Sequence, residues 1–79
     1  MSIANKEKIL EILNIVLENR SKAKQISINT DMHLRNDIGL DSLDLAELTV
    51  RVEAEYDIDI FEDGIVNTVG EILIKLESI

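Results

Sequence analysis

The chain has 79 residues and no cysteine, so it is expected to form one small domain (residues 1–79) without disulfides or thiolate metal sites. Hydrophobic residues make up 46% of it and aromatic residues only 3%, so the core must be built from aliphatic side chains. No apolar run approaches the roughly 18 residues of a membrane span, and the N-terminus lacks the order of a signal peptide. These features predict a cytoplasmic protein.

The charge is distributed unevenly along the chain. Residues 1–36 carry a net charge of +2 and residues 37–79 a net charge of −10, for a total of −8. An acidic surface repels nucleic acid and anionic membranes and attracts basic protein partners. Taken alone, the charge count favours a simpler explanation, that acidity keeps a small domain soluble. The positions of the acidic residues therefore matter more than their number.

The first predicted element is a helix over residues 3–19. Its apolar residues recur at i, i+3, i+4 and i+7, the spacing of one buried stripe. The stripe consists of Ile9, Ile12, Leu13 and Val16.

No long periodicity appears between residues 20 and 41. A connection of this length inside a small domain is normally functional unless it is misassigned. We expect its apolar residues to hold it against the core. They are Ile26, Ile28, Met32, Leu34 and Ile38.

A second helix is predicted over residues 42–55, and it carries two apolar stripes. The inner stripe, expected in the core, contains Leu45, Leu48, Thr49, Val52 and Tyr56. The opposite stripe, here called the outer face, contains Leu43, Ala46, Val50 and Ala54 and is bordered by Asp44, Glu47 and Glu53. A surface helix needs only one apolar stripe, so an acid-rimmed second stripe predicts a docking surface for a partner with a basic rim. The alternative is a helix buried on both sides.

Residues 57–61 alternate like a strand but have no partner strand, so they are interpreted as a connector to a short helix near residues 62–66. The last helix is predicted to open with a capping box between Thr68 and Glu71. Its core stripe would contain Val69, Ile72, Leu73, Leu76 and Ile79. The predicted fold is all-α, a small four-helix bundle of three main helices and one short helix, with a long first loop.

The most informative stretch is residues 36–48. Gly39 breaks the chain, Asp41 is a predicted N-cap, and Ser42 begins the second helix. Unpaired N–H groups and the positive end of the helix dipole at that position favour a phosphate ester. Taken alone, the capping pattern favours the simpler interpretation that Ser42 is an ordinary first-turn residue.

This stretch closely resembles the modification site of acyl carrier proteins, whose hallmark is Asp-Ser-Leu after a short loop containing glycine. The similarity includes Asp37-Ile38-Gly39, Glu47-Leu48 and Thr68-Val69-Gly70-Glu71, and it covers essentially the whole chain in the expected order. The resemblance implies that Ser42 carries 4′-phosphopantetheine, attached covalently from coenzyme A by a phosphopantetheinyl transferase. It also implies that Asp41 and Leu43 flank the attachment site.

By the same resemblance, the chain is a discrete, monomeric carrier rather than an enzyme. It would hold acyl intermediates as thioesters in fatty-acid or related acyl or polyketide biosynthesis. Acyl-loading and acyl-processing enzymes with basic docking patches would recognise Asp44, Ala46, Glu47, Val50 and Glu53.

The chain departs from the family pattern at three positions. Arg51 stands where an uncharged residue is common, Ala54 stands where an acid is common, and Phe61 stands where a proline is usual. Arg51 is also spaced to pair with Glu47 on the same helix. Because of Arg51 and Ala54, partner specificity is expected to differ from that of a housekeeping fatty-acid carrier. Two alternatives stay open: an aminoacyl, peptidyl or otherwise specialised carrier, and an unmodified helical adaptor that binds proteins through the outer face.

No catalytic or metal site is predicted. An EF-hand aligned on Gly64 would place Phe61 at a ligand position and Gly70 where a bidentate glutamate is needed. His33 is the only histidine, and without cysteine a nucleophilic triad would depend on its chance proximity to Ser42.

Overall fold

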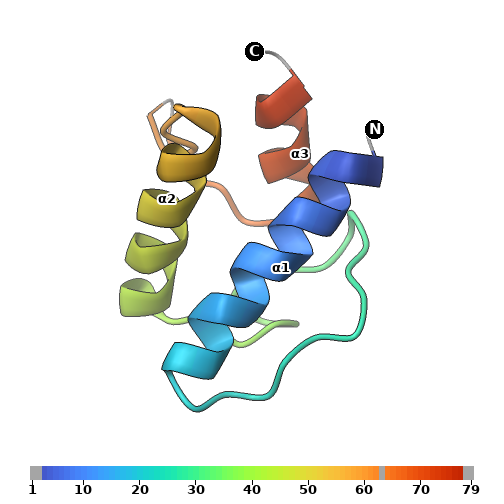
Figure 1. Cartoon of the computed structure of the whole chain (residues 1–79), viewed down its shortest axis with the longest axis vertical. Helices are drawn as coiled ribbons and strands as arrows, with labels where there is room; N and C mark the ends of the chain where they lie inside the picture. The colour runs from blue at the N-terminus through green and yellow to red at the C-terminus, as the bar shows by residue number, and fades with distance from the viewer. Residues whose placement is uncertain (1–2, 63, 78–79) are drawn as a thin grey trace.

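The computed structural model describes residues 3–62 and 64–77 and is all-helical apart from one isolated β-bridge. The three helices are α1 (Ile3–Asn19), α2 (Ser42–Tyr56) and α3 (Val69–Glu77), as Figure 1 shows. Their bounds agree with the three main helices expected from the sequence. α1 packs against both α2 and α3, and the long connection from α1 to α2 wraps around the base of the molecule (Figure 1). Within the described ranges, no helix has the length and apolar character needed to cross a membrane.

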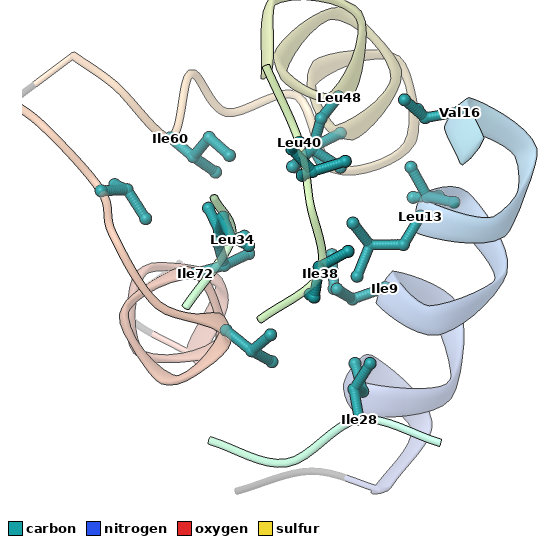
Figure 2. Close-up of a cluster of buried hydrophobic side chains, with 14 of the residues drawn as sticks. Ile9, Leu13, Val16, Ile28, Leu34, Ile38, Leu40, Leu48, Ile60 and Ile72 are labelled. Carbon is teal, nitrogen blue, oxygen red and sulfur yellow. The ribbon is translucent and has the colours of Figure 1, made fainter. Parts of the chain in front are cut away.

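The core is aliphatic and draws on all three helices (Figure 2). The four stripe residues predicted in α1 are buried, and so are Leu48 and Val52 of α2. Leu45 and Tyr56 are partly buried against the same cluster. The α3 stripe is also buried as predicted at Val69, Ile72, Leu73 and Leu76; Ile79 lies outside the described residues.

The long connection contributes to the core directly. Leu34, Ile38 and Leu40 are buried, and Figure 2 shows their side chains among those of the three helices. Met32 is partly buried against the same cluster. Each buried aliphatic side chain of this size contributes about 1.5–3 kcal/mol. The connection is therefore part of the packed structure that supports α2.

One predicted anchor of this connection is wrong, because Ile26 is 98% exposed. The Asn14 side chain on α1 binds the backbone of Gln25 twice, donating to its carbonyl at 2.9 Å and accepting from its N–H at 2.7 Å. These polar contacts hold the chain on the outer surface of α1. Ile28, two residues later, takes the buried position.

The short helix expected near residues 62–66 is not confirmed, because none of the described residues of that segment is helical. The Asp59 carboxylate accepts the Phe61 N–H at 2.9 Å, an Asx-turn that competes with helical hydrogen bonding. Gly64 has φ of +133°, which is not helical. Asp63 lies outside the described residues.

An antiparallel bridge joins the loop before α2 to the start of α3. The Leu34 N–H donates to the Asn67 carbonyl at 2.8 Å, and the Val69 N–H donates to the Met32 carbonyl at 3.1 Å. These bonds fix the chain that leads to Gly39 and α2 against the chain that leads into α3.

The capping box predicted for α3 forms in part. The Glu71 N–H donates to Thr68 Oγ1 at 3.2 Å, as expected. The Glu71 carboxylate accepts from the N–H of Asn67 at 3.2 Å, one residue before the expected donor.

Candidate functional site

Ser42 is the first residue of α2, and its side chain is exposed. Asp41 is the N-cap, as predicted, with extended backbone angles (φ −101°, ψ −175°). Its Oδ1 accepts the Asp44 N–H at 2.9 Å, and Asp44 Oδ2 accepts the Asp41 N–H at 3.0 Å. This capping box satisfies the helix start without the Ser42 hydroxyl, which is left at the surface.

Asp44 lies elsewhere than the sequence indicated. It was expected at the rim of the outer face, but its side chain is fully buried. Lys22 Nζ contacts Oδ2, and Arg20 Nε lies 3.3 Å from Oδ1, which accepts no hydrogen bond. An unpaired carboxylate is too costly to bury. Arg20 and Lys22, in the loop after α1, supply two positive charges that compensate the buried carboxylate. Asp44 therefore supports the start of α2 and is not part of the exposed outer face.

Arg20 and Lys22, here called the basic clamp, also hold the loop before Ser42. Arg20 Nη2 lies 3.1 Å from Asp41 Oδ2, and Lys22 Nζ donates to the Gly39 carbonyl at 3.0 Å. Gly39 has φ of +91°, a conformation that favours glycine. The hydrogen bond from the Asp44 N–H lowers the pKa of Asp41 most, and the charges of the basic clamp lower it further. Asp41 is therefore ionised at neutral pH.

Arg35 is a neighbour of Ser42 that sequence reasoning missed. Its Nη2 donates to Ser42 Oγ at 3.3 Å. Arg35 also lines a cleft of about 430 Å³, whose apolar walls include Leu45, Phe61 and Ile65. Its position just before the Gly39 loop, at the edge of the acidic half of the chain, was the one available signal.

The outer face of α2 is exposed, as predicted. Leu43 is 66% and Val50 67% exposed. The smaller members of the face and one acid of its rim are exposed as well; they are Ala46, Ala54 and Glu53. The alternative of a helix buried on both sides is therefore wrong.

Glu47 lies at the edge of this face, and its carboxylate is hydrogen-bonded within the protein. Its Oε2 accepts from Asn19 Nδ2 at 3.0 Å and from Arg51 Nε at 2.8 Å. The expected pair of Glu47 with Arg51 is thus confirmed. The hydrogen bond from Asn19, followed by that from Arg51, lowers the pKa of Glu47. Glu47 stays ionised but presents a partly neutralised carboxylate.

The residues at Ser42 fit a phosphate ester. The hydroxyl is exposed at a helix N-terminus, where the positive end of the helix dipole favours an anion. The guanidinium of Arg35 adds a positive charge beside it. The nearest acids, Asp41 and Asp44, are paired with the basic clamp, so their repulsion of a phosphate is reduced.

Comparison with known proteins leads to the same chemistry. Residues 7–73 match a family model described as a phosphopantetheine attachment site. An acyl carrier protein of Amoebophilus asiaticus is 33% identical over 70 residues, covering 86% of each chain. One of Rickettsia canadensis is 37% identical over 65 residues, covering 80% of this chain and 74% of the relative.

A mitochondrial acyl carrier protein of Saccharomyces cerevisiae is 33% identical over 54 residues, which is 68% of this chain but only 43% of that protein. No solved structure matches the chain significantly. The family model covers most of the chain, and its cofactor is the phosphopantetheine that the residues around Ser42 suit. The chain therefore belongs to the acyl carrier protein family, whose members are phosphopantetheine-bearing carriers and not enzymes.

Proposed function

We propose that Ser42 is the attachment point of 4′-phosphopantetheine and that the chain carries acyl intermediates in fatty-acid or related acyl or polyketide biosynthesis. When bound, the arm supplies a terminal thiol that holds acyl groups as thioesters. The observation that carries this proposal is the exposed hydroxyl of Ser42 at the start of α2, left out of the capping box. A phosphopantetheinyl transferase can reach this hydroxyl without unfolding the helix.

The surroundings of Ser42 support its role as the attachment residue. The basic clamp holds the carboxylates of Asp41 and Asp44, so the loop before Ser42 is fixed from the side of α1. Leu43, the following residue, is exposed and can contact the transferase together with Asp41. These contacts restrain the loop that leads to Ser42, which favours productive encounter with the transferase.

The test is incubation with a promiscuous phosphopantetheinyl transferase, coenzyme A and magnesium, followed by intact mass measurement. The unchanged chain should gain one arm and Ser42→Ala none, while a circular dichroism melt shows that the variant stays folded. Ser27→Ala, which removes another exposed serine, is the matched control and should be modified normally. An unmodified wild-type chain would indicate the adaptor alternative, and a modified Ser42→Ala protein would place the arm elsewhere.

We propose the outer face of α2 as the surface that partner enzymes recognise. Leu43, Ala46 and Val50 supply exposed apolar area, and Glu53 an exposed carboxylate for a basic patch. Glu47 contributes less than expected because Asn19 and Arg51 already bind it. Asp44 is excluded because it is buried.

The cargo distinguishes the remaining alternatives. The strong acidity and the Asp-Ser-Leu motif favour acyl groups over aminoacyl or peptidyl groups. Loading of the modified chain by a malonyl or acyl transferase, compared with loading by an adenylating enzyme specific for amino acids, tests this preference. A single carrier domain over residues 1–79, a monomeric state and a cytoplasmic location stay predictions.

A further inference from the structure

Arg35 differs from the other basic residues around the start of α2. Arg20 and Lys22 are both paired with the carboxylates of Asp41 and Asp44. Arg35 is exposed, and within residues 3–62 and 64–77 it forms no ion pair; its one polar contact is with Ser42 Oγ, at 3.3 Å. A guanidinium therefore lies beside the attachment oxygen without an anion of its own.

We propose that Arg35 binds the phosphodiester of the arm and so positions the root of the arm on Ser42. This inference rests on the proposed attachment at Ser42. The phosphorus would be bonded to Ser42 Oγ itself, so its charged oxygens lie only two bonds from the atom that Arg35 already contacts. A guanidinium presents a planar fork of donors that matches phosphate oxygens, and it stays charged at any physiological pH.

The location of Arg35 also determines on which side of α2 the arm would be held. Arg35 lines the cleft whose apolar walls include Leu45, Phe61 and Ile65, whereas the outer face of α2 is formed by Leu43, Ala46, Val50 and Ala54. A phosphodiester bound to Arg35 is held on the side of α2 that borders the cleft. Arg35 is thus a positioning residue, which limits the directions in which the arm leaves the protein.

The contact between Arg35 and the phosphodiester would be exposed to solvent, so its effect on the position of the arm is limited. Exposed ion pairs change an equilibrium by no more than about fivefold, and salt screens them. Removing the charge should therefore lower the anchored fraction of the arm by up to about fivefold at low salt. The difference should shrink as salt is added.

The experiment compares modified and unmodified protein by NMR for wild type, Arg35→Gln, Arg35→Lys and Lys24→Gln. Lys24 is exposed and pairs with Glu18, so its substitution removes one positive charge from another part of the surface. Modification should shift the Arg35 Nε–H signal of the wild type. The transverse relaxation of the ³¹P signal of the arm should be slower in Arg35→Gln, because the arm is more mobile, and Arg35→Lys should recover part of the effect. Lys24→Gln should behave like the wild type.

Two results would overturn the inference: an Arg35 Nε–H signal that modification does not move, or equal ³¹P relaxation in wild type and Arg35→Gln at low salt. The first measurement needs no variant, so it decides even if Arg35→Gln is poorly modified. Intact mass separates the two proposals. A wild type that gains an arm but fails these measurements refutes only the role of Arg35, whereas a wild type that gains none refutes both.

Discussion

Asp44 offers the most decisive test of how the attachment site is held. Its carboxylate is fully buried, contacts Lys22 and Arg20, and accepts the Asp41 N–H. Breaking a buried ion pair from one side typically costs about 3–5 kcal/mol. Lys22 and Arg20 have side chains about one third exposed (32% and 34%), so both can regain water when the acid is removed. We therefore expect Asp44→Ala to lower the free energy of unfolding by about 2–4 kcal/mol.

That loss is large for this chain. A 79-residue domain has a total stability of roughly 4–12 kcal/mol, and 1 kcal/mol shifts the melting temperature of such a domain by about 4–8 °C. The melting temperature should fall by roughly 10–30 °C. Urea denaturation at low temperature, followed by circular dichroism, measures the change even when the variant is marginally stable.

Two further variants separate the possible causes. Asp44→Asn keeps the shape and an acceptor for the Asp41 N–H but removes the charge, so its loss should be intermediate. Glu53→Ala removes an exposed acid from the same helix and should change stability by less than about 0.5 kcal/mol. If Asp44→Ala is as stable as Glu53→Ala, then Asp44 is not buried as described, and the argument for the basic clamp is wrong.

Three other outcomes are expected. Val50→Asp should weaken the binding of partner enzymes with little change in the melting temperature, whereas Leu48→Asp should unfold the domain by burying a charge; the reverse result would mean that the two faces of α2 are exchanged. Because the pKa of Asp41 is lowered in the folded state, its stabilisation is complete above the unfolded value and disappears as the pH falls from 3.8 through the lower folded value. The stability difference between wild type and Asp41→Asn should therefore shrink in denaturation curves as the pH is lowered below 3.8, and a constant difference would contradict this. Gly70→Ala should lower the melting temperature despite better helix propensity, because the new Cβ would lie 2.9 Å from the Thr30 carbonyl oxygen; a rise would show that this backbone contact relaxes easily.

Local sequence patterns were sufficient to predict the three main helices and the N-cap at the start of α2. The apolar residues of the α1 stripe and of the inner α2 stripe repeat with the helical period, and the side of each helix that carries its stripe packs into the core. The N-cap at Asp41 was predictable because its side chain bonds to a backbone group only three residues away. The exposure of Leu43 and Val50 followed from the same period, since a helix cannot turn both stripes toward one core.

The short helix near residues 62–66 shows where local patterns were ambiguous. An acidic stretch after a connector suits a helix start, but it suits a series of turns equally well. The side chain of Asp59 captured the Phe61 N–H, and Gly64 took a backbone angle outside the helical region. The same residues are compatible with a short helix and with turns, so the sequence pattern did not distinguish the two structures.

The helical segments, the outward apolar face of α2 and the serine that begins that helix could be predicted from the amino-acid order, because these properties depend on residues within a few positions of one another. The burial of Asp44 and the contact of Arg35 with Ser42 could not be predicted, because they depend on how distant segments pack. Lys22 is 22 residues from Asp44, and Arg35 is placed beside Ser42 by a loop whose Leu34, Ile38 and Leu40 are packed into the core. A buried carboxylate needs positively charged side chains beside it, and the position of those side chains depends on how the whole chain packs.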